Sequence, residues 1–167
     1  MKYLCLDYGQ ARTGVAVSDA EGRMAFPRCT LTRGPQTPKR VFWERLFSCL
    51  AAEAPGALVV GLPLREDGSD SPTTRQARNF AASLQRRSLL PVYLMPELLS
   101  SQAAQADLAA CGLAPHKHKT VLDQQAAVRI LESFLADPGR ERYRATPPPF
   151  AACPPGLPRV PDMENTP

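Results

Sequence analysis

Length and composition limit this chain to a single globular domain. Its 167 residues are enough for one buried core and short for two, and 44% are hydrophobic and 22% charged. No apolar run approaches the ~18–20 residues of a membrane span, which argues against a membrane protein. The net charge of +4 and the isoelectric point of about 8.9 are compatible with a nucleic-acid partner but do not require one.

The N-terminal part of the chain predicts three short strands. Residues 2–8, 13–18 and 24–32 are apolar runs separated by turn residues. Short loops between them favour two antiparallel hairpins. The first run meets Asp7 at once and has no small-residue cleavage site, so we expect a strand, no signal peptide and a cytoplasmic protein.

Helices and strands alternate in the middle of the chain. Phe42, Leu46 and Leu50 recur at four-residue spacing, which predicts an amphipathic helix over residues 39–53. The continuous apolar run at residues 57–60 is typical of a strand that is buried on both faces.

The next helix is predicted to begin at Ser71, because serine followed by proline is a favourable helix start. A short strand at residues 91–95 follows. We expect two further helices, one from Ser100 or Ser101 to near Gly112 and one over residues 121–136.

This order predicts an α/β fold with a mixed five-stranded sheet. Three antiparallel hairpin strands precede two parallel strands, and helices cover both faces. From Pro138 onward the chain carries nine of its eighteen prolines and few apolar residues. We therefore expect a domain over residues 1–137 and a proline-rich, mostly disordered tail over residues 138–167.

The cysteines do not predict a zinc site or a disulfide framework. They are odd in number, widely spread, and without a C-x-x-C pair. We expect reduced, buried thiols of a cytoplasmic protein. The five positions are Cys5, Cys29, Cys49, Cys111 and Cys153.

Two carboxylates stand at the ends of predicted strands. Asp7 lies in an apolar strand in phase with Tyr3 and Cys5, where a carboxylate is costly unless it is paired or binds a cation. Glu97 follows the strand ending at Met95, and ligands of open α/β sheets bind beyond the carboxyl ends of strands. The alternative interpretation of Asp7 is a residue that only starts a turn, and that of Glu97 is a solvated loop residue.

A third carboxylate, Asp123, lies on the apolar stripe of the last predicted helix. That stripe consists of Ala126, Ala127, Ile130, Leu131 and Phe134. The alternative is a capping box from Thr120 to Asp123, and both roles can coexist.

Asp7, Glu97 and Asp123 together would supply oxygen ligands to Mg²⁺ or Mn²⁺. Two such ions can clamp the attacking and leaving oxygens of a phosphodiester. The two histidines, His116 and His118, are expected in a basic loop, and metal-activated water would replace a histidine base.

Four motifs along residues 2–136 resemble, in order and spacing, those of the YqgF (RuvX-like) family. They are DYGQARTGVAVSD from Asp7, VGLPLREDG from Val60, ELLSS from Glu97 and DQQAAVRIL from Asp123. The resemblance implies an RNase H-like fold, a catalytic triad at Asp7, Glu97 and Asp123, and a metal-dependent nuclease that matures the 5′ end of precursor 16S ribosomal RNA.

We also expect nucleic-acid contacts from four basic residues near these motifs, Arg12, Arg65, Lys117 and Lys119. The partner would be precursor ribosomal RNA, or the assembling small ribosomal subunit. The chain would act as a monomer or a homodimer.

The third motif departs from the family pattern. Pro96 replaces an Asp and Leu98 replaces an Arg, which removes a candidate phosphate clamp and predicts slow cleavage. This departure favours one alternative, a nucleic-acid-binding factor with weak or no catalysis. A resolvase of branched DNA is a second alternative, because it would need the same metal site together with a dimer. An actin-like ATPase would need two such domains, which 167 residues cannot hold.

Overall fold

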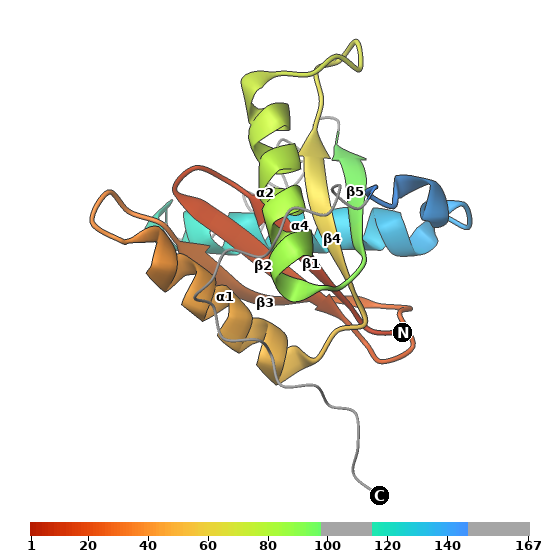
Figure 1. The fold of residues 1–167 in the computed structure, drawn as a ribbon, viewed down its shortest axis with the longest axis horizontal. Helices are drawn as coiled ribbons and strands as arrows, with labels where there is room; N and C mark the ends of the chain where they lie inside the picture. Colours follow the sequence, from red (N-terminus) through yellow and green to blue (C-terminus); the bar gives the residue numbers. More distant parts are fainter. Residues whose placement is uncertain (98–114, 147–167) are drawn as a thin grey trace, which may run out of the picture.

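The computed structural model of the chain describes residues 1–97 and 115–146, with the backbone alone for residues 115–120. Its centre is a five-stranded sheet with the order β3-β2-β1-β4-β5 (Figure 1). The strands are β1 Tyr3–Tyr8, β2 Arg12–Ser18, β3 Ala25–Thr32, β4 Ala57–Pro63 and β5 Val92–Glu97.

Strand directions confirm the predicted mixed sheet. β1 pairs with β2, and β2 with β3, in antiparallel hairpins, whereas β1–β4 and β4–β5 are parallel pairs. The carboxyl ends of β1, β4 and β5 therefore lie at the same end of the sheet. β5 continues past the expected end at Met95 and includes Glu97, which pairs with Pro63.

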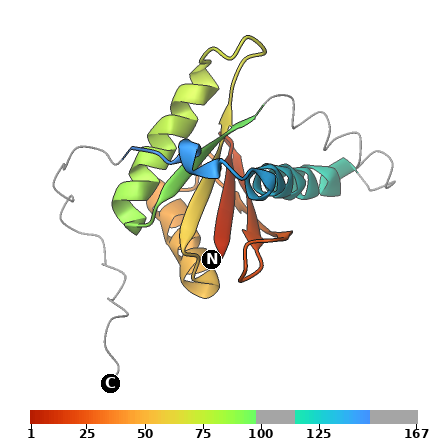
Figure 2. The same cartoon turned by 90° about the vertical axis from the view of Figure 1, so that its right-hand side faces the viewer.

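Helices cover both faces of the sheet, as predicted. Figure 2 shows the sheet edge-on, with α1 (Lys39–Glu53) and α2 (Pro72–Ser88) on one side and α4 (Pro115–Ala136) on the other. Strand alternation gives each face its own core. Leu4 and Leu6 of β1 pack under α1 and α2, and the intervening Cys5 packs under α4.

The two helices on the first face begin and bury residues as the sequence predicts. α1 buries Phe42, Leu46 and Leu50. The Ser71 side chain caps α2 by accepting a hydrogen bond from the backbone N–H of Thr74, in a full capping box.

α4 begins at Pro115, six residues earlier than the start expected at Val121. Proline suits a first helical turn because that turn needs no N–H donor. The basic segment with His116 and His118, expected as a loop, is therefore helical, and Thr120 lies inside the helix. That placement excludes the Thr120 capping box and leaves Asp123 in the helix body. The helix expected between Ser100 and Gly112 lies outside the described residues.

The C-terminal described segment packs on the outer edge of the sheet. After α4, the 3-10 helix η1 (Arg140–Tyr143) leads to Ala145, whose N–H donates to the Val92 carbonyl oxygen at 2.8 Å. Ordered structure therefore continues past the boundary expected at residue 137. The predicted disorder of the tail beyond residue 146 lies outside the described residues.

The structure bears on the predictions about membrane-spanning helices and about the cysteine thiols. None of the helices in residues 1–97 and 115–146 is long and apolar enough to cross a membrane. In the same part of the chain Cys5, Cys29 and Cys49 are free thiols, of which Cys5 and Cys49 are buried and Cys29 is half-buried.

Candidate active site

Asp7 lies near the end of β1, on the face that α4 covers. It follows the buried Cys5 on that face and is itself half-buried. Both neighbouring strands carry a glycine beside it. Gly14 of β2 is its register partner, and Gly61 of β4 follows Val60, the partner of Leu6. The carboxylate of Asp7 thus lies between two positions that have no side chain.

Gly14 allows α4 to approach the sheet. A Cβ at this position would overlap the backbone carbonyl oxygen of Asp123. The same part of α4 is tied to β3, since Nε2 of Gln124 donates to Oγ1 of Thr30 at 3.3 Å. Asp7 is the register partner of Gly14, so the close approach of α4 at Gly14 also brings Asp123 close to Asp7.

Gly61 makes the corresponding space for Glu97. A Cβ at this position would overlap Oε1 of Glu97 and lie 2.8 Å from Cδ1 of Ile130. The Glu97 side chain thus folds back over β4 toward Asp7. The backbone supports this arrangement, because the N–H of Leu64 donates to the Glu97 carbonyl oxygen at 3.2 Å.

The three carboxylates lie near enough to repel one another. Burial, then the charge of Glu97, then that of Asp123 raise the pKa of Asp7 from its ordinary 3.8 to about 7. Burial, followed by the charges of Asp7 and Glu97, also raises the pKa of the Cys5 thiol. The structure therefore brings together the residues that the sequence selected as a triad; their catalytic and metal-binding roles stay predictions.

Arg12 joins this cluster from the start of β2. Its Nε donates to Oδ2 of Asp123 at 2.7 Å, and the two side chains are 36% and 21% exposed. The sequence predicted a nucleic-acid contact for Arg12 and did not predict this ion pair.

The sequence profile of the RuvX family, described as Holliday junction resolvase, matches residues 1–137. This chain belongs to the RuvX family. Curated relatives can be aligned with this chain over almost their whole length. A protein of Nitratidesulfovibrio vulgaris strain DP4 is 54% identical over 145 residues, which are 87% of this chain and 100% of the relative. One of Lawsonia intracellularis is 48% identical over 144 residues, 86% and 99% of the two chains. Both are named "Putative pre-16S rRNA nuclease".

The solved structure of Thermus thermophilus RuvC confirms the RNase H-like fold of this RuvX-family chain. The two superpose with a TM-score of 0.50 at 18% sequence identity, over 86% of this chain and 98% of RuvC. A second structure of that protein, "T. thermophilus RuvC in complex with Holliday junction substrate", also gives a TM-score of 0.50, over 78% of this chain.

The donor chemistry of this RuvX-family site fits a hard divalent cation. Asp7, Glu97 and Asp123 offer carboxylate oxygens, which Mg²⁺ and Mn²⁺ prefer, and Gly61 leaves space for them to converge. Within residues 1–97 and 115–146, however, no three His, Cys, Asp or Glu side chains lie close enough to hold an ion as they stand. Arg12 engages one of these oxygens, Oδ2 of Asp123, in this arrangement.

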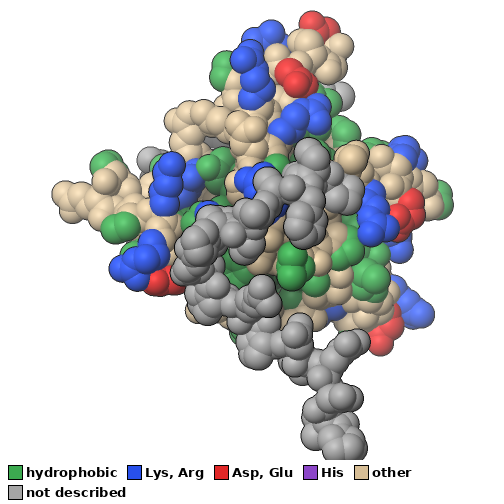
Figure 3. All heavy atoms as spheres, in the orientation of Figure 1, with side chains coloured by type: hydrophobic (Ala, Val, Ile, Leu, Met, Phe, Trp, Pro, Cys, Tyr) green, Lys and Arg blue, Asp and Glu red, His purple; other side chains and the backbone are tan. Residues whose placement is uncertain are grey.

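The other predicted nucleic-acid contacts lie on two segments beside the site. Arg65 is exposed on the loop that leaves β4, close in sequence to the Pro63–Glu97 pair. Figure 3 shows Lys and Arg side chains at the upper end of the molecule, where this loop and the start of α2 lie. Lys117 and Lys119 belong to the first turns of α4, ahead of Asp123.

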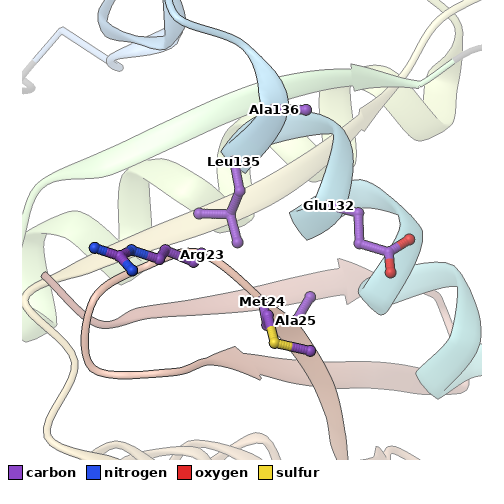
Figure 4. A pocket seen from close by; sticks show the side chains of 6 residues that line it. All are labelled: Arg23, Met24, Ala25, Glu132, Leu135 and Ala136. Carbon is purple, nitrogen blue, oxygen red and sulfur yellow. The ribbon is translucent and has the colours of Figure 1, made fainter.

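A shallow pocket of about 260 Å³ lies between the C-terminal end of α4 and the turn from β2 to β3, and Figure 4 shows the side chains that line it. It is lined by Arg23, Met24, Ala25, Glu132, Leu135 and Ala136. A helix rises ~1.5 Å per residue, which puts Glu132 roughly 13 Å along α4 from Asp123. The pocket therefore belongs to the opposite end of α4 and adds nothing to the site.

We expect Gly14→Ala to destabilise the fold and displace Asp123. The added methyl group meets backbone, which cannot swing aside as a side chain can. Overpacking of this kind costs about 1–3 kcal/mol, measurable by urea unfolding. Gly34→Ala is the matched control, because within residues 1–97 and 115–146 its Cβ would meet only Oγ1 of Thr37, at 3.8 Å. Equal stability of the two variants would contradict a close approach of α4 to β2.

Proposed function

We propose that this chain is a metal-dependent nuclease that hydrolyses a phosphodiester bond at the 5′ end of precursor 16S ribosomal RNA. The observation that carries this proposal is the convergence of Asp7, Glu97 and Asp123 on one face of an RNase H-like sheet. The substrate is supported by the name of curated relatives, one of which is 54% identical to this chain.

Each carboxylate would hold a cation from a different element. Asp7 reaches the site from β1, Glu97 from the end of β5 and Asp123 from α4. A bound Mg²⁺ or Mn²⁺ would activate water and stabilise the charge that develops on the phosphate. Burial and the mutual repulsion of the carboxylates, which together raise the pKa of Asp7, favour uptake of positive charge at this place.

Basic side chains would bind the phosphate backbone on either side of the cleaved bond. Arg65 would do so from the loop after β4, and Lys117 and Lys119 from the first turns of α4. Contacts to phosphates fix the position of the nucleic acid without reading its sequence. The choice of cleavage position would then depend on RNA shape, or on the assembling small ribosomal subunit.

A resolvase of branched DNA is the second candidate, because the family is described as Holliday junction resolvase. The related fold of RuvC has been solved with a Holliday junction substrate. Such an enzyme would need the same carboxylates plus a dimer that presents two sites to a symmetric junction.

The departure of the third motif leaves the strand itself intact. Pro96 lies within β5, paired with Leu62, and is exposed. Proline is tolerated there because β5 is an edge strand of the sheet. Leu98, where the family places an Arg, lies outside the described residues, and the slow cleavage expected from its loss stays a prediction.

Parallel cleavage assays test the proposal. Purified protein is incubated with a precursor 16S RNA fragment or a four-way DNA junction, in Mg²⁺, Mn²⁺ or EDTA. We expect metal-dependent cutting of the RNA and intact junctions. Cutting of the junction alone would favour the resolvase, and binding of RNA without cutting would favour a non-catalytic factor.

Glu97→Gln should lower the rate of RNA cleavage by about 10²–10³, since it removes a charge at the reacting centre and keeps the shape of the side chain. Glu44→Gln is the matched control, because Glu44 is exposed on α1 and pairs only with Arg40 among the described residues. Comparable rates for the two variants would place the chemistry elsewhere.

A further inference from the structure

Arg12 links the carboxylate cluster to the surface. Its Nε donates to Oδ2 of Asp123 at 2.7 Å, and its side chain is 36% exposed. In the part of the chain that the structure describes, this contact uses only Nε. The two terminal nitrogens of the guanidinium remain for another acceptor, and phosphate is the anion that suits the guanidinium fork.

Arg12 and a divalent cation would compete for the same carboxylate. Oδ2 of Asp123 accepts the hydrogen bond from Arg12, and it is also one of the few oxygens that could ligate an ion at this place. The guanidinium and the ion repel each other as well, because both are positive. While Arg12 holds Asp123, no three acidic side chains of the described residues stand at ion-holding distance.

We infer that Arg12 is a displaceable counter-ion of the site. In the free protein it neutralises Asp123 and weakens cation binding; when a nucleic-acid phosphate draws the guanidinium away, Asp123 becomes available to the cation. Cation and nucleic acid then bind cooperatively, so that the site is completed on the substrate. The inference rests on the proposed metal-dependent function and adds the order in which its parts come together.

Cooperativity of this kind must be reciprocal, which makes it measurable without cleavage. The nucleic-acid probe is a 5′ fragment of precursor 16S RNA with phosphorothioate linkages. Calorimetric titration with Mn²⁺, with and without this probe, gives the effect of the RNA on cation affinity. Fluorescence anisotropy of the labelled probe, with and without Mn²⁺, gives the converse.

We expect the RNA to tighten Mn²⁺ binding to the parent protein by about 5- to 150-fold, the usual range of such coupling. Arg12→Gln should bind Mn²⁺ more tightly than the parent without RNA, and the RNA should then add little. Arg28→Gln is the matched control, because Arg28, on the outer strand β3, likewise pairs through its Nε with a carboxylate, that of Glu53 at the end of α1. It should behave as the parent does.

Several results would overturn the inference. Mn²⁺ binding that Arg12→Gln weakens would show that Arg12 instead holds Asp123 in place for the cation. Mn²⁺ binding that is equal in the parent and Arg12→Gln would show that the two do not compete. Arg12→Lys tests whether a folding defect explains the behaviour of Arg12→Gln, because it keeps the positive charge. It should keep part of the coupling between Mn²⁺ binding and RNA binding. No Mn²⁺ binding in any variant would instead refute the metal-dependent function, and this inference with it.

Discussion

Asp7→Asn is expected to abolish RNA cleavage and at the same time to stabilise the metal-free protein. Asparagine keeps the size of the side chain but loses the charge that would hold a cation between β1 and α4. Removing that interaction should lower the rate by at least about 10³, since metal ions contribute several kcal/mol of charge stabilisation.

The stabilisation follows from the raised pKa of Asp7, about 7 against an ordinary 3.8. Between these two values the folded protein binds more protons than the unfolded chain, so stability falls as the pH rises through this window. Above it the folded protein carries the full cost of an ionised, half-buried Asp7, roughly 4 kcal/mol. Asparagine has no charge to bury and avoids that cost.

Thermal unfolding in EDTA across this pH window measures the effect. The melting temperature of the parent should fall as the pH rises from about 4 to about 7, and that of Asp7→Asn should fall less. Asp19→Asn is a control with the opposite pKa shift, because hydrogen bonds from the backbone N–H groups of Met24 and Arg23 lower the pKa of Asp19. It should cut RNA as the parent does and gain no stability. An Asp7→Asn protein that cleaves at the parent rate would refute hydrolysis at this site.

The arrangement of the sheet was predictable because each strand follows a simple pattern. Apolar runs and short turns predicted the two hairpins, and the continuous run at residues 57–60 predicted a parallel strand buried on both faces, as observed. Asp7 and Asp123 could be selected because a charge is conspicuous among apolar neighbours, and Glu97 because it follows a predicted strand at the end where ligands bind. The hydrophobic pattern that predicts burial is local in the sequence, so it can be recognised without the structure.

The start of α4 was predicted wrongly, because charge and helix propensity point in different directions there. Basic residues at 116–119 suggested a loop, although lysine is a good helix former and Pro115 can begin a helix. A capping pattern at Thr120 then strengthened the wrong start. Such patterns are short, and a longer helix that continues through them overrides them.

The parts of the site that sequence analysis missed all depend on distant contacts. Gly14 and Gly61 were seen as motif letters, but the reason for glycine at each lies in residues of other elements, Asp123 and Glu97. The pair of Arg12 with Asp123 joins positions 111 residues apart. Both glycines flank Asp7 in the observed sheet, where a missing side chain opens space, but the strand order and register that place them there were not predicted from the sequence.

Gly61→Ala should disable the enzyme while leaving most of its stability. The new methyl group would overlap Oε1 of Glu97, which is the far end of a flexible side chain and can move aside. Unfolding should therefore change by no more than the ~1–3 kcal/mol of overpacking. Moving the carboxylate by about 1 Å is enough to cost roughly 10²-fold in rate.

A second substitution can separate displacement of Glu97 from general damage. Glu97→Asp shortens the side chain and removes its overlap with a methyl group at position 61, so Gly61→Ala should do less harm in that background. Non-additive effects on the RNA cleavage rate, measured as a double-mutant cycle, would reveal this coupling. Ile130→Val is the corresponding test for the other neighbour, whose Cδ1 would lie 2.8 Å from the new Cβ. Added to Gly61→Ala, Ile130→Val should recover stability but not the rate of RNA cleavage. If Gly61→Ala instead cleaves RNA at the parent rate, Glu97 need not lie over Gly61 for catalysis.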